Sequence, residues 1–241
     1  MRSVRGKGQL RSLGANLQPA RCCCGADPIS PANQTLAQRP SGYGFHLRCP
    51  RCYPECERVI KEATGAARVV AFDHIVRNAA MAALKGSCVK IPAKRVHNDY
   101  TAWSSPVRVR QLMGDEAEEL LKHRYAIINL WRPIRGSVLE SPLTLCDAES
   151  LSEEDLVASD LKYPDRTGET YSITYNPQQR YYYFPRMQAD EPVLIRCFDS
   201  ALQGAARFSA HTGFDDPTSP PDAPPRESTE VRSLVFFPPE V

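Results

Sequence analysis

Short apolar segments alternate with polar breaks through the second half of the chain. The breaks contain turn-forming residues, as in Asn176-Pro177 and in the run from Asp190 to Pro192. Several short strands at regular spacing are typical of a β-sandwich or barrel. We therefore predict strands over residues 143–146, 171–175, 181–184, 192–198, 206–211 and 229–237. The predicted fold is mainly β with flanking helices, around a double-stranded β-helix, or jelly-roll, core.

The first half of the chain predicts helices beside this β core. Pro54 suits the first turn of a helix and Gly65 suits its end. A β-branched, apolar strand is expected over 67–72, a second helix over 115–123 and a further strand over 125–131. Residues 151–159 are expected to form a loop or a short helix.

The strand predicted over 125–131 has two unlike faces. Ala126, Ile128 and Leu130 lie on one face, and Asn129 lies on the other. If a helix covers the purely apolar face, the Asn129 amide points to the opposite side of the sheet. There it would bind a small acid, or it would form a cross-strand hydrogen bond.

Candidate chemistry is concentrated in the stretch from Arg95 to Thr101, which contains a His-x-Asp pair. In an extended strand His97 and Asp99 project to the same side. An imidazole nitrogen and a carboxylate oxygen on one face can hold one metal ion. His211, at the end of the strand predicted over 206–211, is the candidate third ligand. Two histidines and one carboxylate with open positions are the ligand set of non-haem Fe(II) oxygenases.

Each of these residues also has a purely structural interpretation. His97 can be a hydrogen-bonded structural histidine with Asp99 in a turn, and His211 can satisfy backbone groups where a loop begins. Asp73-His74 is a poor metal clip, because adjacent strand residues face opposite ways. We expect His74 to pack against its surroundings or to touch a ligand from the cavity wall.

Downstream of His211, Arg226 and Ser228 again share a strand face. A guanidinium holds a carboxylate through two parallel hydrogen bonds, and a hydroxyl can add a third. The alternative is a solvated strand face. Arg232 has the same parity and is a rival to Arg226, but we expect it at the far end of its strand.

Composition narrows the class of protein. The 241 residues have a formal net charge of +2 and show no electrostatic footprint for nucleic acid. No apolar run is long enough for a membrane span, and residues 1–17 have no apolar signal-peptide core. The Arg-rich start fits a transit peptide or a basic tail. We expect a cytoplasmic protein with an irregular Cys- and Pro-rich segment over 1–52 and the jelly-roll domain over 53–241.

Six of the nine cysteines lie in the first quarter of the chain. The odd count and the missing secretory signal argue against a disulfide framework. Cys49-x-x-Cys52, with the triplet at 22–24, can form a zinc site, but the spacing is irregular and adjacent cysteines do not readily share a tetrahedral ion.

Several longer motifs, running from about Tyr53 to Phe237, resemble a known family. They are Arg95–Thr101, Ile128–Ile134, Leu145–Asp147, Tyr182–Met187, Phe198–Ser200 and His211–Pro217. Together they resemble the family that contains asaB-type hydroxylase/desaturases and the cephamycin C-7 methoxylation component. Many of these proteins are Fe(II)/2-oxoglutarate oxygenases of secondary metabolism. The resemblance implies His97, Asp99 and His211 as iron ligands, with Arg226 and Ser228 holding the far carboxylate of 2-oxoglutarate.

The expected function is therefore an Fe(II)/2-oxoglutarate-dependent dioxygenase that hydroxylates or desaturates a small secondary metabolite. The alternative is a non-catalytic or redox-neutral family member that assists a partner enzyme. Apart from its small-molecule substrate, we expect no nucleic-acid or membrane partner, and a homodimer is allowed. Residues 181–184 are expected to line an apolar substrate pocket or to pack in the core.

Overall fold

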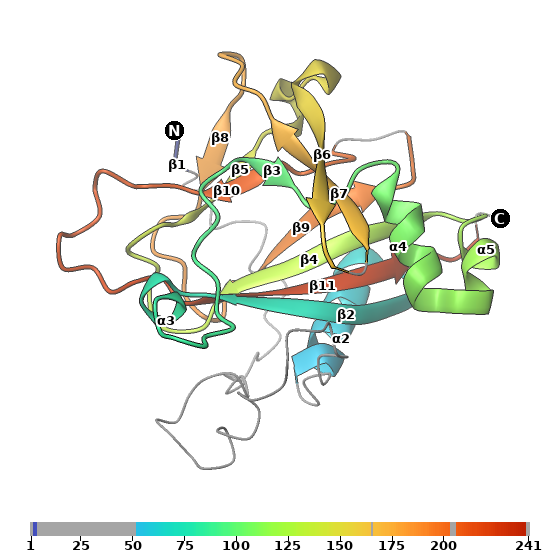
Figure 1. Ribbon diagram of the computed structural model, residues 1–241, viewed down its shortest axis with the longest axis horizontal. Coiled ribbons are helices and arrows are strands. Elements are labelled where there is room, and N and C mark those ends of the chain that lie inside the picture. The colour runs from blue at the N-terminus through green and yellow to red at the C-terminus, as the bar shows by residue number, and fades with distance from the viewer. Residues whose placement is uncertain (1, 4–51, 165, 203–205, 240–241) are drawn as a thin grey trace, which may run out of the picture.

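The computed structural model describes residues 2–3, 52–164, 166–202 and 206–239. Two β-sheets are stacked on one another (Figure 1). The larger sheet has, in spatial order, β1 (Arg2–Ser3), β8 (Tyr181–Tyr183), β5 (Leu143–Cys146), β10 (His211–Gly213), β3 (His97–Asn98), β7 (Thr167–Ile173) and β6 (Leu156–Lys162). The smaller sheet has β2 (Arg68–Arg77), β11 (Ser228–Phe236), β4 (Tyr125–Pro133) and β9 (Val193–Asp199). This mainly β, two-sheet architecture confirms the predicted jelly-roll core.

The strand β4 divides its side chains between two layers, as its sequence predicts. Ala126, Ile128 and Leu130 pack against Val59 and Ile60 of the helix α2 (Cys52–Thr64). This helix lies on the side of the smaller sheet that faces away from the larger one (Figure 1). It ends at Gly65, whose φ of +70° is a conformation that favours glycine.

The opposite face of β4 points between the sheets. There Trp131 of β4 packs with Val193 and Ile195 of β9 and with Leu143 of β5. These contacts join the two sheets by apolar burial. They leave the neighbouring inward positions of β4 and β11 for polar side chains, which form the site described below.

Three shorter helices and three 3-10 turns lie in the described connections. They are α3 (Ala79–Ala82), α4 (Ser104–Met113), α5 (Ala117–Leu120), and the 3-10 segments η2 (Gly114–Glu116), η3 (Ala148–Ser150) and η4 (Glu153–Asp155). The helix expected over 115–123 is therefore wrong in its extent, since only α5 and part of η2 fall in that range. Ala117 of α5 packs with Ile127 on the face of β4 that α2 does not cover.

The helix α4 was not predicted, because the side that it buries is largely polar. Ser104 and Ser105 are buried together with Val109. The Ser104 hydroxyl donates to the Glu169 carbonyl at 2.8 Å, and the Ser105 hydroxyl lies 3.3 Å from the Tyr125 hydroxyl. Buried serines with hydrogen-bond partners leave no apolar stripe for a sequence pattern to detect.

Two further predictions, both for segments of the larger sheet, were also wrong. A loop or a short helix was expected over 151–159, but residues 156–162 form the edge strand β6. The side chains of β6 are mostly exposed, so they do not alternate in polarity. The strand expected over 206–211 is β10, which begins at His211 instead of ending there. Ser209, before it, donates its backbone N–H to the Asn98 side chain at 3.2 Å and is not part of a ladder.

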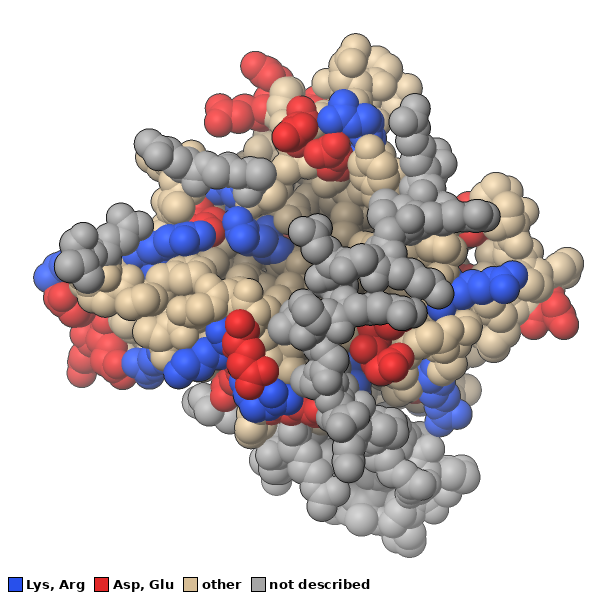
Figure 2. Space-filling model, turned by 180° about the vertical axis from the view of Figure 1, so that it is seen from behind, with Lys and Arg blue, Asp and Glu red and all other residues tan. Residues whose placement is uncertain are grey.

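The irregular segment predicted over 1–52 and the candidate zinc cysteines lie outside the described residues, apart from Arg2, Ser3 and Cys52. On the face shown in Figure 2, acidic and basic side chains are interspersed over the described residues. Within the described parts of the chain, no helix is long and apolar enough to cross a bilayer.

Candidate metal centre

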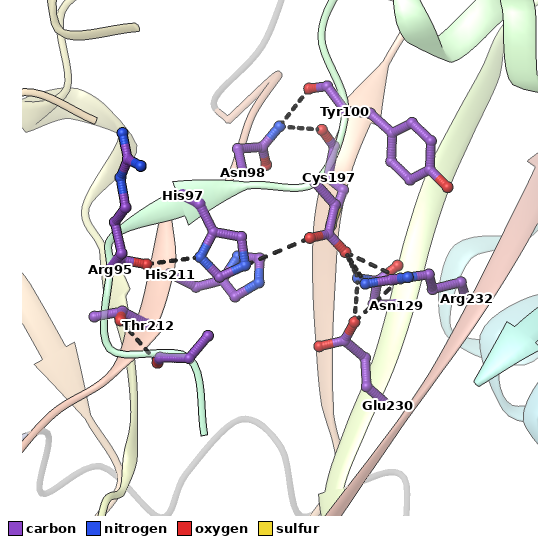
Figure 3. Close-up of polar contacts among 12 residues, drawn as sticks. Arg95, His97, Asn98, Tyr100, Asn129, Cys197, His211, Thr212, Glu230 and Arg232 are labelled. Carbon is purple, nitrogen blue, oxygen red and sulfur yellow. Dashed lines mark hydrogen bonds and ion pairs between the residues drawn. The ribbon is translucent and has the colours of Figure 1, made fainter. Parts of the chain in front are cut away.

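Two neighbouring strands of the larger sheet bring the candidate histidines together. His211 of β10 pairs with His97 of β3 in the antiparallel register. Their ring centroids lie 4.6 Å apart. Asp99 follows β3 directly, and its Oδ1 lies 3.5 Å from His97 Nε2. One ligand atom from each of the three residues can be chosen so that all lie within 4.8 Å of one another (Figure 3).

Both imidazole rings are oriented by a backbone carbonyl two residues earlier in the chain. His97 Nδ1 lies 2.8 Å from the Arg95 carbonyl oxygen, and His211 Nδ1 lies 2.8 Å from the Ser209 carbonyl oxygen. A carbonyl accepts a hydrogen bond, so each Nδ1 carries a proton, and in the neutral ring Nε2 then has the lone pair that a metal can bind. This is how metal-binding histidines are commonly fixed. The two Nε2 atoms and one Asp99 oxygen fit a divalent metal such as Fe(II).

Asp99 is held from the opposite sheet. Its Oδ2 accepts a hydrogen bond from Asn129 Nδ2 at 2.8 Å and lies 3.1 Å from both Nε and Nη2 of Arg232 (Figure 3). Asn129 and Arg232 are register partners in β4 and β11. The Asp99 carboxylate therefore meets the smaller sheet through Oδ2 and His97 through Oδ1.

Burial and neighbouring charges set the protonation of the three residues. Burial alone would raise the pKa of Asp99, but Arg232, followed by His97, holds it well below its usual range. Burial alone would lower the pKa of His97, but the hydrogen bond and charge of Asp99 raise it. Burial, together with the charge of His97, lowers the pKa of His211 to about 4. An ionised carboxylate and a neutral His211 are the forms that bind a metal.

Arg226 and Ser228 are both buried and continue the inward face of β11 toward its start. The Arg226 guanidinium donates to the Ser141 carbonyl through Nη1 and lies 5.5 Å from the Trp131 ring centroid. Its buried Nε has no hydrogen-bond partner among the described residues. Burial, together with the charge of Arg77, lowers the pKa of Arg226 to about 10. A buried cation with an unpaired donor is a site that an anion would satisfy.

Arg232 lies in a different environment, and it is not at the far end of β11 as expected. It sits near the middle of the strand, where Asp73, Asp99 and Glu230 surround it at 3.1–3.3 Å. Burial alone would lower the pKa of Arg232, but Asp99 and Glu230 raise it well above its usual value. The signal in the sequence was strict alternation, which places the side chains of Arg226, Ser228, Glu230 and Arg232 on one face.

Asn129 points to the inner side of the sheet, as predicted from its position between apolar residues. Its amide nitrogen donates to two carboxylates of the chain itself, Asp99 at 2.8 Å and Glu230 at 3.1 Å. A direct contact between Asn129 and a bound acid stays a prediction. The role of buried Glu230 was not foreseen, since a lone glutamate in a strand gives no sign of its partners.

Two other predictions concern His74 and the aromatic residues 181–184. His74 is on the outer face of β2, with its Nδ1 2.9 Å from the Tyr53 hydroxyl, so it packs under α2. Within residues 181–184, Tyr182 has the same register position as Leu145 and His211 across β8, β5 and β10. Tyr182 therefore lies on the sheet face that carries the histidines, whereas Tyr181 and Tyr183 lie on the other.

Comparison with known proteins gives a consistent result. A family model described as "Oxidoreductase/YMDC permease-like domain" matches residues 50–236. Hydroxylase/desaturase efuI of Hormonema carpetanum is 33% identical over 208 residues, which cover 77% of this chain and 69% of that protein. Aspirochlorine biosynthesis protein N of Aspergillus oryzae is 43% identical over 133 residues, which cover 54% of this chain and 56% of that protein.

A solved structure shares the fold. The iron and alpha-ketoglutarate-dependent endoperoxidase NvfI superposes with a TM-score of 0.70 at 32% sequence identity, over 75% of this chain and 66% of that one. The chain thus spans between 56% and 69% of the length of these relatives. It belongs to this oxidoreductase-like family, together with the fungal hydroxylase/desaturases and Fe(II)/2-oxoglutarate-dependent dioxygenases that it resembles.

Proposed function

We propose that the chain is an Fe(II)/2-oxoglutarate-dependent dioxygenase that hydroxylates or desaturates a small secondary metabolite. The observation that carries this proposal is the arrangement of His97, Asp99 and His211, whose ligand atoms lie within 4.8 Å of one another. Both histidines are held in the tautomer that leaves Nε2 free for a metal. Relatives named as hydroxylase/desaturases and dioxygenases support the same reaction class.

In this proposal His97, Asp99 and His211 would hold the iron. Iron, when bound with 2-oxoglutarate and dioxygen, supplies the oxidising power that breaks an unactivated C–H bond. The chain supplies ligands, orientation and an enclosed site. Asp99 neutralises part of the metal charge, and the carbonyls of Arg95 and Ser209 keep a proton on each Nδ1 atom.

The anchor for the far carboxylate of 2-oxoglutarate is Arg226, with Ser228 beside it. Arg226 has a buried, unpaired Nε and forms no ion pair with a described carboxylate, whereas Arg232 is surrounded by three. A guanidinium already neutralised by the chain gains little from a further anion. A buried guanidinium that forms no direct ion pair gains a charge-assisted pair. The contrast supports Arg226 over its rival.

The test is succinate release by the purified chain supplied with Fe(II), 2-oxoglutarate and oxygen. We expect succinate above the level of a chelator-treated sample, and its loss in His211→Ala. The exposed His123, which lies outside the site, provides the control His123→Ala. Tight iron binding without succinate would favour the non-catalytic alternative, and the absence of both would exclude the proposed function.

A further inference from the structure

The Arg232 guanidinium links the two sheets at the metal centre. Its Nη1 lies 3.2 Å from Asp73 Oδ2, which belongs to the register partner of Arg232 in β2. Its Nε and Nη2 lie 3.1 Å from Oδ2 of Asp99, which directly follows β3 of the other sheet. Glu230 Oε1, two residues away on the same face, lies 3.3 Å from Nε. Arg232 therefore holds the candidate metal ligand Asp99 against a cluster that is anchored in the smaller sheet.

Asn129 adds a second donor to the same oxygen. Its amide nitrogen donates to Asp99 Oδ2 at 2.8 Å and to Glu230 Oε1 at 3.1 Å, while its Oδ1 has no hydrogen-bond partner among the described residues. Two carboxylate acceptors on one side fix the orientation of this amide, because a flipped amide would turn its oxygen toward both of them. Glu230 thus keeps Asn129 aimed at Asp99.

All of these donors converge on one of the two carboxylate oxygens. Oδ2 receives Asn129 and Arg232, and Oδ1 faces His97 Nε2 at 3.5 Å (Figure 3). A metal between the histidines competes with these N–H groups for Oδ2 but not for Oδ1. A carboxylate that bound through both oxygens would occupy one more position on the metal, which a two-oxygen cosubstrate and dioxygen need to be open.

We propose that Arg232 and Asn129 are positioning residues that hold Oδ2 of Asp99, so that Asp99 presents only Oδ1 to the metal. This inference rests on the proposed function, since it concerns the same metal. It assigns Arg232 a role that differs from cosubstrate binding. It also gives a reason for the three carboxyl groups, of Asp73, Glu230 and Asp99, that lie around one arginine between the sheets.

The experiment measures Co(II) binding to the full chain, with Co(II) as an oxygen-tolerant probe whose visible absorption reports coordination geometry. The variants are Arg232→Met and Asn129→Leu, which remove the donors at similar volume. Loss of an outer-shell partner typically weakens metal binding by about 10- to 100-fold. We expect a loss of that size in both variants, with a changed Co(II) spectrum. Arg232→Lys should recover part of the affinity, because an ammonium can still pair with Oδ2.

A matched control separates positioning from general stability. Arg124 forms a comparable pair with the buried carboxylate of Asp199, with Nε–Oδ1 and Nη2–Oδ2 distances of 3.1 and 2.8 Å, and this pair takes no part in the site. Arg124→Met should lower the melting temperature and leave the Co(II) affinity and spectrum unchanged. If Arg232→Met does not fold, Asn129→Leu, which leaves no charge unpaired, decides the question.

The inference would be overturned if Asn129→Leu, and Arg232→Met where it folds, kept the Co(II) spectrum and bound Co(II) within twofold of the affinity of the original chain. A chain that binds neither Fe(II) nor Co(II) before any substitution would instead overturn the proposed function. The two failures are thus distinguishable, since the first leaves the metal in place.

Discussion

The metal centre has a histidine half and a carboxylate half, and the chain holds them in different ways. His97 and His211 are each oriented by a carbonyl two residues earlier, and they are register partners on adjacent strands. Asp99 is held by Asn129 and Arg232, which lie 30 and 133 residues further along the chain and in the other sheet. The histidine half is therefore a property of one sheet, and the carboxylate half depends on how two sheets meet.

This difference separates two kinds of damage. A change that shifts one sheet against the other should disturb Asp99 while the two imidazoles keep their geometry. A change within β3 or β10 should disturb the imidazoles directly. The same contrast extends to the two arginines on the inward face of β11, since Arg232 is saturated by carboxylates and Arg226 is not.

Breaking the histidine half should have the largest effect. In His97→Ala or His211→Ala one of three ligands is lost, so we expect metal binding to weaken by more than the roughly 100-fold upper range of an outer-shell loss. Iron per chain and succinate release measure this. Unchanged iron content and turnover in both variants would exclude the assignment.

The second-largest effect is expected when the Asp99 carboxylate is displaced but its negative charge is kept. Asp99→Glu adds one methylene, so its carboxylate oxygens leave the positions that Asp99 holds between His97 and Arg232. A misplacement of about 1 Å can cost about 100-fold in rate, and we expect a loss of that order in succinate release. The control is Asp73→Glu, which lengthens a carboxylate that contacts Arg232 but lies outside the ligand set. Equal losses in the two variants would contradict the distinction between them.

The two arginines can be separated through the cosubstrate. Arg226→Ala should raise the 2-oxoglutarate requirement by an amount equivalent to about 2–5 kcal/mol, because a partly buried charge-assisted pair is lost. Iron binding should be kept. Arg226→Lys should restore only part of the affinity, since lysine lacks the planar fork. If Arg232→Ala raises the requirement and Arg226→Ala does not, the anchor is Arg232.

A smaller effect is expected at Ser228, the buried first residue of β11. Ser228→Ala removes one neutral hydroxyl from the same anchor, which typically costs about 1 kcal/mol. The apparent 2-oxoglutarate affinity should fall accordingly, by severalfold. The control is Ser233→Ala on the opposite face of β11, which should leave that affinity unchanged; a larger loss at Ser233 than at Ser228 would argue against the anchor.

The smallest effect is expected from deleting residues 1–50. The contacts of both halves of the centre lie between Arg95 and Arg232. Within the deleted range the structure describes only β1, which pairs with β8 at the sheet edge, three strands from β10. Iron binding should therefore be retained, as measured by metal content. Unfolding on chelation that maps to Cys49 and Cys52 in the full chain would instead favour a zinc site there.

Local features of this protein follow from the sequence because they depend on near neighbours. The period of two places His97 and Asp99 on one side and separates Asn129 from Ala126, Ile128 and Leu130, and the structure has both arrangements. Pro54 and Gly65 likewise define α2 to within two residues, because capping and chain-conformation preferences act over a single turn.

The tertiary structure alone decided which of these residues meet. The pairing of His211 with His97 is a choice of register between segments 114 positions apart, and no local pattern specifies it. The same packing of the sheets pairs Arg232 with Asp99 and lets the Asn129 amide donate to two carboxylates. It leaves the Nε atom of Arg226 without a hydrogen-bond partner among the described residues. A polar side chain in a strand shows its face but not its partner, because the partner comes from another strand or sheet whose position is set by the packing of the whole core.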